Sequence, residues 1–193
     1  MDLKDINNNI LSSTWKSRYE KLSDKVKEKL NNLDNANIDD YQLQVIMKKK
    51  NYPLVGDIFE INTHDNIVVY GIVINNHINN NNGNDLLLVM IFKSEVSIDN
   101  IISNHLTKES LLIPPQMVGK EYWTKGYFYN VDHYDQKVCI ENYGFYYIGK
   151  DKYVDEYGKE IINKPQILGT YGVATISGIA RKISQELIIS ETI

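Results

Sequence analysis

Three runs of apolar residues between positions 55 and 92 dominate the hydrophobic pattern of this chain. They are Gly56–Ile61, Ile67–Ile74 and Leu86–Phe92, and they consist largely of β-branched, leucine and aromatic residues. Runs of this kind, separated by polar turn residues, are typical of consecutive antiparallel strands. The second and third runs show no regular polar alternation, which indicates strands that are covered on both faces.

Two short features suggest how these strands are connected and curved. Asn82-Gly83 lies between the second and third runs, and this pair is suited to the positive φ angles of a hairpin turn. Gly71 interrupts the second run, as expected where a strand bends or bulges so that a barrel can close. The pattern therefore predicts a strongly curved, barrel-like antiparallel sheet.

The N-terminal part of the chain has a helical pattern instead. Apolar residues recur at steps of three and four along one stripe of an amphipathic helix, at Leu11, Trp15, Tyr19, Leu22, Val26, Leu30 and Leu33. Ser12 or Ser13 is a suitable N-cap for this helix. We expect the helix to lie across the sheet, and a partner-binding arm is the alternative.

Residues 41–50 have both helical and strand-like features. Tyr41, Leu43, Val45 and Met47 alternate like a strand, whereas Asp39-Asp40 and the lysines at 48–50 complement the two ends of a helix dipole. The helix is favoured, and Pro53 ends it. The sequence thus predicts an N-terminal helical extension over residues 1–50 and a mainly β domain over residues 51–193.

The remainder of the chain continues the β pattern and ends in a helix. We expect a short helix at 97–102, a strand at 111–113 that Pro114-Pro115 stops, and a hairpin formed by 127–131 and 138–148. Residues 155–158 have the residues of a type I turn. The asparagine-rich stretch 75–84 is expected to be a loop tip.

The C-terminal helix is indicated by one apolar stripe, formed by Ile176, Ile179, Ile183 and Leu187, with Ser177 as the expected cap. The predicted fold class is therefore α+β. It combines a mostly antiparallel, strongly curved sheet with an N-terminal helical segment and a C-terminal helix.

Charge is unevenly distributed along the 193 residues, whose formal net charge is −4. Residues 1–50 hold 10 Lys and Arg against 8 Asp and Glu, whereas residues 51–193 hold 11 against 17. An acidic main domain is a poor electrostatic partner for nucleic acid and a better one for a basic protein. Charge thus favours a protein partner over nucleic acid.

Cysteine usage and the N-terminus indicate the compartment. Cys139 is the single cysteine, so no internal disulfide can form and a reducing compartment is favoured. The first residues lack the basic-then-apolar pattern of a signal peptide, and no apolar run approaches the ~20 residues needed to span a bilayer. We expect a cytoplasmic protein that is not associated with a membrane.

A search for catalytic and metal-binding patterns finds only weak candidates. Cys139 with His133 could form a nucleophile–base pair, but a lone cysteine in an apolar strand is more often buried and inert. Asp132 to Asp135 offers metal-ligand atoms, but adjacent strand residues point to opposite faces. Three glycines before the last helix, at 169, 172 and 178, lack a P-loop or dinucleotide fingerprint. We therefore expect no enzyme activity, no metal and no cofactor.

Tyrosines with neighbouring acids provide the best candidates for an interaction surface. Tyrosine gives a large, rigid contact area and is enriched at protein interfaces. The proposed partner-binding residues are Asp132, Tyr134, Asp135, Asp155, Glu156 and Tyr157. Equally, about half of the aromatic rings could line the core while the acids form a solvated face.

Several short motifs in this chain resemble the immunity protein 26 family of bacterial polymorphic toxin systems. They are Gly56–Ile61, Tyr70-Gly71, Pro114-Pro115, Trp123–Phe128, Tyr143-Gly144-Phe145, Tyr153–Gly158, Ile167-Leu168-Gly169 and Tyr171-Gly172, and together they cover about residues 51–185. The resemblance implies a mostly β protein that binds and neutralises a toxin encoded next door. Residues 1–50 lie outside the pattern, and the stretch 75–84 resembles an insertion.

Three functions of different classes follow from these features. The first is an immunity protein that neutralises a cognate toxin by stoichiometric binding, and we expect this toxin to present a basic surface. The second is a barrel-based module that recognises a peptide or another ligand through exposed aromatic residues. The third, an enzyme that uses His133, Cys139 or the glycines before the last helix, is disfavoured because no catalytic constellation is evident. The toxin, its activity and the oligomeric state do not follow from the sequence.

Overall fold

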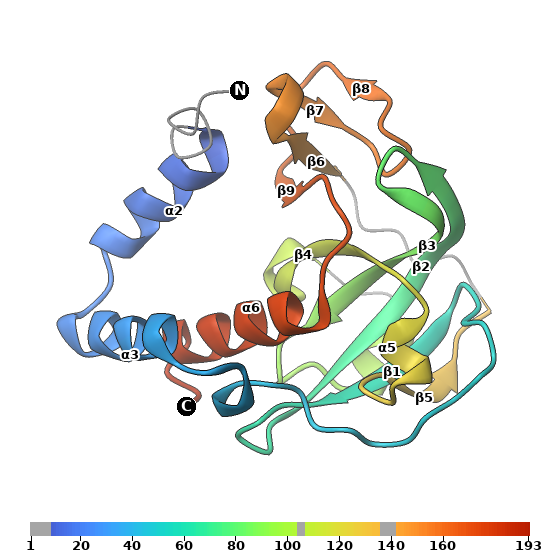
Figure 1. Cartoon of the computed structure of the whole chain (residues 1–193), viewed down its shortest axis with the longest axis horizontal. Coiled ribbons are helices and arrows are strands. Elements are labelled where there is room, and N and C mark those ends of the chain that lie inside the picture. The colour runs from blue at the N-terminus through green and yellow to red at the C-terminus, as the bar shows by residue number, and fades with distance from the viewer. Residues whose placement is uncertain (1–8, 104–106, 136–141) are drawn as a thin grey trace.

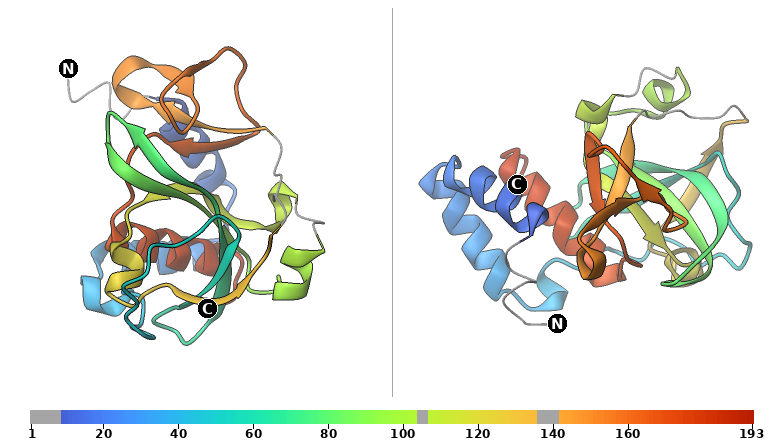
Figure 2. Two further views of the ribbon diagram at one scale, coloured as in Figure 1. Left: turned by 90° about the vertical axis from the view of Figure 1, so that its right-hand side faces the viewer. Right: turned by 90° about the horizontal axis from the view of Figure 1, so that it is seen from above.

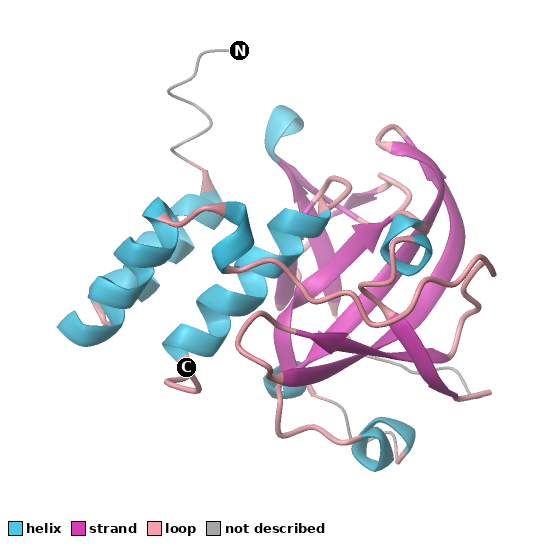
Figure 3. Cartoon of the chain, turned by 60° about the horizontal axis from the view of Figure 1, so that its bottom comes forward, coloured by secondary structure: helices cyan, strands magenta, loops and turns pink. Residues whose placement is uncertain are grey.

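The long helices and the two sheets occupy separate sides of the molecule. The computed structural model describes residues 9–103, 107–135 and 142–193. The longest helices, α2 (Ile10–Glu20), α3 (Asp24–Asn35) and α6 (Ile176–Ile189), lie together on one side of the strands (Figure 1, Figure 3). The mixed α+β class is therefore confirmed.

The main sheet has five strands in the order β4-β3-β2-β1-β5, and all neighbours are antiparallel. The strands are β1 (Asp57–Asn62), β2 (Val68–Asn80), β3 (Gly83–Phe92), β4 (Leu111–Val118) and β5 (Tyr129–His133). The first three are the consecutive antiparallel strands that the apolar runs predict.

A second sheet of four strands has the order β8-β7-β6-β9, and its β6–β9 pair is parallel. Its strands are β6 (Tyr143–Tyr147), β7 (Lys152–Val154), β8 (Glu160–Ile161) and β9 (Ile167–Thr170). The short helices are α4 (Ile98–Ile102) and α5 (Glu121–Thr124), and the 3₁₀ turns are Ile38–Asp40, Lys108–Ser110 and Ile148–Lys150. Figure 2 shows both sheets on the side away from the long helices.

The prediction of a barrel-like sheet is not supported. Strands β4 and β5 are the two edges of the main sheet, and in the described residues they are not paired with each other. Gly71 serves close packing rather than bending, because a Cβ at this position would overlap the ring of Phe59 on the neighbouring strand. The aromatic ring therefore occupies the space that the glycine leaves.

The asparagine-rich stretch is strand rather than loop. Strands β2 and β3 stay paired up to Asn80 and Gly83, so the turn itself is only two residues long. Neither Asn82 nor Gly83 has the positive φ expected of it; left-handed φ angles occur instead at His77 (52°) and Asp85 (57°). These two residues lie in the part of the hairpin where its register shifts.

The expected hairpin of 127–131 with 138–148 is wrong for the described residues of these two segments. Strand β5 pairs with β1, whereas β6 pairs with β7 and β9 in the other sheet. Residues 138–141 lie outside the described part of the chain. Pro114-Pro115 also does not stop β4, because this strand is at the sheet edge, where proline is tolerated.

The N-terminal pattern is interrupted into two helices. Asn9 caps α2, in place of Ser12 or Ser13, and Ser23 caps α3 by accepting a hydrogen bond from the Val26 amide. Similarly, Thr175 rather than Ser177 caps α6. The short helix α4 and the 155–158 turn, which is closed by a 3.1 Å hydrogen bond from Gly158 N to Asp155 O, agree with expectation.

The favoured helix at 41–50 is absent. This segment is extended, and its amides donate to distant carbonyls: Gln44 to Asn62, Ile46 to Gly126 and Lys49 to Trp123. Tertiary hydrogen bonds thus override the local preference for helix. None of the helices in the described part of the chain is long and apolar enough to cross a membrane.

The largest core cluster joins the N-terminal segment to the sheet and to α6. Val26, Leu30 and Leu33 of α3 are buried in one cluster with Phe59 of β1 and Ile183 of α6. Trp15, Tyr19 and Leu22 are partly buried against that cluster. The helical side and the sheet side of the molecule therefore share apolar contacts.

Candidate partner-binding surfaces

The six residues predicted to bind a partner lie in two separate places. Asp132, Tyr134 and Asp135 lie at the end of β5, which pairs with β1 next to the first half of β2. Residues 155–157 form the β7–β8 turn and contact Asn75 and Asn80 in the second half of β2. In Figure 1, β5 and β8 are accordingly at different ends of the sheet region.

A hydrogen-bonded network fixes the end of β5. Buried Asp57 of β1 accepts hydrogen bonds from Asn130 Nδ2 (2.6 Å) and from Leu54 N (2.9 Å), and its Oδ1 lies 2.8 Å from His133 Nδ1. Trp123 Nε1 donates to Asn130 Oδ1 at 2.6 Å, which links the network to the core. The backbone of β5 is thus held by side-chain contacts as well as by its pairing with β1.

His133 is placed between two carboxylates. Its Nε2 lies 3.2 Å from Asp135 Oδ1, on the opposite side of the ring from Asp57. The hydrogen bond with Asp57, chiefly, and the neighbouring negative charges raise the pKa of His133. The arrangement resembles an acid–base dyad, but both ring nitrogens already face carboxylates. Sequence reasoning did not single out Asp57 as a functional residue, although it lies in the Gly56–Ile61 motif of the family resemblance.

Exposed apolar residues lie next to these acids. Leu54, Val55 and Val131 are 57 %, 42 % and 38 % exposed. Leu54 and Val55 lead into Gly56, whose carbonyl accepts the Tyr134 amide at 2.9 Å. Asp132 and Asp135 are exposed, while Tyr134 is partly buried against a core cluster. We call this set, Leu54, Val55, Val131, Asp132, Tyr134 and Asp135, the β5-end surface.

The acids of the β7–β8 turn are engaged within the fold. Glu156, only 9 % exposed, accepts hydrogen bonds from Asn75 Nδ2 (3.0 Å) and Tyr143 OH (3.2 Å). Asp155 Oδ1 accepts the amides of Tyr157 (3.0 Å) and Lys159 (2.8 Å). Burial, followed by the charge of Glu156, raises the pKa of Tyr143. Of this group, Tyr157 is the most accessible to a partner, at 53 % exposed.

Most of the other aromatic residues that suggested an interface are core residues. Tyr122, Trp123, Phe128 and Phe145 are buried, and the first three form one group of ring contacts with Phe59. The expectation that about half of the rings line the core is therefore reasonable for this chain.

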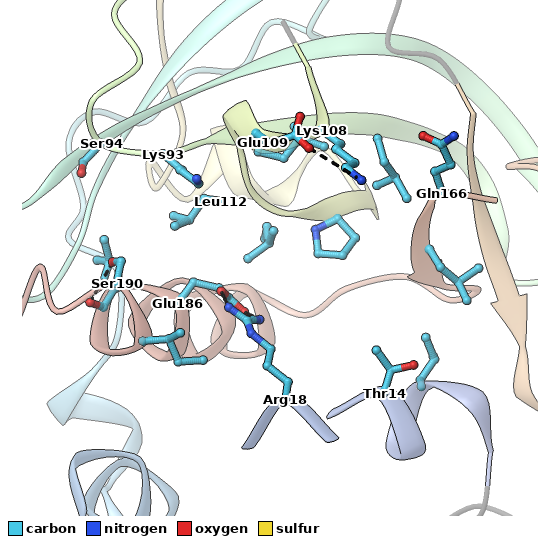
Figure 4. Close-up of a pocket in the computed structure, with 18 of the residues that line it drawn as sticks. Thr14, Arg18, Lys93, Ser94, Lys108, Glu109, Leu112, Gln166, Glu186 and Ser190 are labelled. Atoms are coloured by element: carbon cyan, nitrogen blue, oxygen red, sulfur yellow. Dashed lines mark hydrogen bonds and ion pairs between the residues drawn. The ribbon is translucent and has the colours of Figure 1, made fainter. Parts of the chain in front are cut away.

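A cleft of about 680 Å³ opens between α2 and the body of the protein. Figure 4 shows Arg18 reaching from α2 to Glu186 on α6, with Lys93, Lys108 and Glu109 on the opposite wall. Leu112, Ile113 and Pro114 of β4 contribute apolar surface. The walls of this cleft come from segments that are far apart in the chain, so no single motif outlines it, although Pro114 and Ile167-Leu168 belong to motifs named above.

The weaker candidates for chemistry find no support in the described residues. Cys139 lies outside them, so the pairing with His133 cannot be examined. Within residues 9–103, 107–135 and 142–193, no group of three His, Cys, Asp or Glu side chains is placed to hold a metal ion. Of the three glycines, Gly178 lies within the first turn of α6 and donates its amide to Thr175 Oγ1 at 3.1 Å.

Comparison with known proteins gives one informative result. No curated protein and no solved structure matches the chain. The family model described as Immunity protein 26 matches residues 54–152, just over half of the chain. The matched segment runs from the start of the β5-end surface through β6, and the similar motifs from Tyr153 onward lie beyond it. The chain therefore belongs to the Immunity protein 26 family.

Proposed function

We propose that this protein is an immunity protein that neutralises a cognate bacterial toxin by binding it stoichiometrically. The observation that carries the proposal is the match to the Immunity protein 26 family over residues 54–152. Family membership also supports a non-enzymatic role. The protein acts in the cytoplasm of the toxin-producing cell, with a protein partner rather than nucleic acid, in keeping with its acidic main domain.

The β5-end surface is the proposed primary contact. Its exposed aliphatic side chains can be desolvated by a partner, and Asp132 and Asp135 can steer a basic toxin surface during association. The Asp57 network supports this choice, because a preorganised strand end loses little conformational entropy on binding.

The β7–β8 turn is proposed as a secondary contact through Tyr157. Asp155 and Glu156 support it from within, since both accept hydrogen bonds inside the fold. Their substitution would disturb the turn as well as any interface. Effects at these two positions must therefore be separated from effects on stability.

The direct test is co-expression with the neighbouring toxin gene. The double variant Asp132→Lys with Asp135→Lys should lose protection and should associate with purified toxin roughly tenfold more slowly at low salt. Tyr134→Ala should mainly speed dissociation. A control with the same change of net charge is Asp39→Lys with Asp65→Lys, two exposed acids outside this surface.

The protection assay shows whether the β5-end surface is the primary contact with the toxin. Full protection by the Asp132→Lys, Asp135→Lys variant would exclude the β5-end surface as the primary contact. An equal loss of protection in the Asp39→Lys, Asp65→Lys control would show that net charge, rather than this surface, determines binding. If the neighbouring gene product is harmless without this protein, the immunity function itself is excluded.

A further inference from the structure

We propose that the cleft beneath α2 binds an acidic, aliphatic peptide segment of a partner protein. This inference goes beyond toxin binding by the β5-end surface, because the cleft has the opposite charge character. The residues that line the cleft come from α2, β4, α6 and the loops after β3 and before β9 (Figure 4). A volume of about 680 Å³ falls within the range of ligand-binding clefts.

Positive charge remains in the cleft after its own ion pairs are formed. Glu186 accepts two hydrogen bonds from Arg18 (2.7 and 2.6 Å), and Glu109 lies 3.6 Å from Lys108. Lys93 and Lys164 also line the cleft, and neither forms an ion pair with the part of the chain that the structure describes. Glu95 is the one remaining lining carboxylate that is not paired there.

An adjoining hollow of about 330 Å³ adds a third cation. It shares Leu11, Ile113 and Leu168 with the main cleft and is lined also by Lys182 of α6. Lys182 Nζ donates to the neutral Gln116 Oε1 at 2.8 Å, and burial lowers the pKa of this ammonium group. Lys182 forms no ion pair with the described residues, so a carboxylate from a ligand would supply its counter-charge.

The floor of the cleft determines which anionic partner fits. Leu111, Leu112, Ile113, Ile167 and Leu187 are aliphatic residues that line it. A nucleic acid would leave these residues without apolar partners and would find no exposed aromatic ring for base stacking. A peptide that alternates aliphatic and acidic side chains satisfies both the floor and the cationic rim.

Helix α2 contributes a wall that leaves the cleft accessible. None of its residues is fully buried, and Arg18 with the partly buried Trp15 and Tyr19 connects it to the body. Leu11 and Thr14 of α2 face the cleft. A helix with few buried contacts can adjust to a bound segment at low cost.

The test uses the full chain and three defined peptides. Fluorescein-labelled, acetylated (Leu-Glu)₃ is titrated by fluorescence anisotropy, with (Leu-Lys)₃ as the charge-reversed control and (Ser-Glu)₃ as the control without aliphatic side chains. We expect binding of (Leu-Glu)₃ with a Kd on the order of 0.1 mM, and binding of the controls at least tenfold weaker.

Two double charge-reversal variants test whether (Leu-Glu)₃ binds in the cleft. Lys93→Glu with Lys164→Glu should weaken (Leu-Glu)₃ binding at least tenfold, whereas Lys125→Glu with Lys159→Glu, two exposed lysines elsewhere, should leave it unchanged. If the first variant does not fold, an NMR titration of the wild-type protein with (Leu-Glu)₃ locates the binding site from amide chemical-shift changes. Perturbations at Thr14, Ser94 and Gln166 are expected on addition of (Leu-Glu)₃.

Four results would overturn the inference. They are equal binding of (Leu-Lys)₃, shift changes confined to residues outside the cleft, no binding of (Leu-Glu)₃ at about 1 mM, and preferential binding of a dT₂₀ oligonucleotide at these same residues. Self-association that closes the cleft, measured by light scattering, would identify a second copy as the occupant instead. None of these assays requires the toxin, so their failure is distinct from failure of the immunity function.

Discussion

At the scale of single residues, His133 shows how a buried acid acts on an exposed group. Asp57 lies at the start of β1 and is nearly inaccessible, yet its hydrogen bond raises the pKa of His133 beside the β5-end surface. The pair also joins β1 to β5 through side chains, beyond the backbone hydrogen bonds of the strands. Protonated His133 therefore places a positive charge beside this surface, and its raised pKa favours that protonated form.

Replacing Asp57 by Asn should lower the pKa of His133, because the dominant hydrogen bond to its protonated ring is weakened. NMR titration of the imidazole measures this directly, and Asp132→Asn serves as the control. A raised pKa in the folded state contributes stability below about pH 6.5, and this contribution is lost as pH rises through the folded value. The wild-type protein should therefore lose more stability than the Asp57→Asn variant as the pH rises above about 6.5. An identical histidine titration in both proteins would contradict this.

Gly71 allows a second test at this scale. A Cβ there would collide with the Phe59 ring and with the Met90 carbonyl, so Gly71→Ala should cost about 1–3 kcal/mol of unfolding free energy. Gly172→Ala is the matched control, because no atom lies within 4 Å of its added Cβ. Denaturant unfolding measures both. Equal stability of the two variants would show that the sheet adapts to the methyl group.

At the scale of elements, the asparagine-rich hairpin end has a defined structural role. Asn75 and Asn80 donate to Glu156, and Asn76 Nδ2 donates to the Pro53 carbonyl at 3.4 Å. Tyr52 stacks on His77 at 4.6 Å, and the His77 Nδ1 lies 2.6 Å from Asp85 Oδ1. A stretch of low complexity thus connects the main sheet, the β7–β8 turn and the segment before β1.

Loss of these amides should destabilise the protein although the stretch resembles a passive loop. Asn75→Ala and Asn80→Ala should each cost about 1 kcal/mol, because half-buried acceptors on Glu156 lose their donors. Asn82→Ala, at an exposed turn position, should be neutral. Thermal unfolding of the three variants provides the comparison. Unchanged stability of all three variants would mean that water satisfies the acceptors on Glu156 when the side-chain amides are removed.

Sequence reasoning succeeded for elements whose signal is local. The apolar runs gave β1, β2 and β3, and the stripe from Ile176 to Leu187 gave α6. It failed where partners are distant: β5 and β6 follow one another in sequence but belong to different sheets. The Asp57 network and the cleft were missed for the same reason, since their residues meet only after folding.

At the scale of the whole molecule, the two N-terminal helices differ in what they contribute. Helix α3 buries Val26, Leu30 and Leu33, while α2 buries none of its residues completely. Burial of three aliphatic side chains is worth about 5–8 kcal/mol, which is comparable to the stability of a whole domain. The proposed boundary at residue 50 marks a change in the sequence pattern. Apolar contacts of α3 nevertheless cross it into the rest of the protein.

Two truncations test this division. Removal of residues 1–22 should lower the melting temperature by only a few degrees, whereas removal of residues 1–37 should lower it by more than about 10 °C or prevent folding. Calorimetry or circular dichroism of both proteins measures the difference. Independent stability of residues 51–193 would instead support an autonomous β domain.

The pairing of α3 with α6 has a consequence for synthesis on the ribosome. Helix α3 ends at Asn35, and its apolar partner α6 ends at Ile189, four residues before the end of the printed chain. At translation rates of about 5–20 residues per second, roughly 10–30 s separate the emergence of the two helices. During that interval the apolar face of α3 lacks the cover that α6 provides in the folded protein. The native α3–α6 packing therefore exists only in molecules whose α6 has left the ribosome, and the immunity role proposed above would require such copies to be present before a toxin arrives.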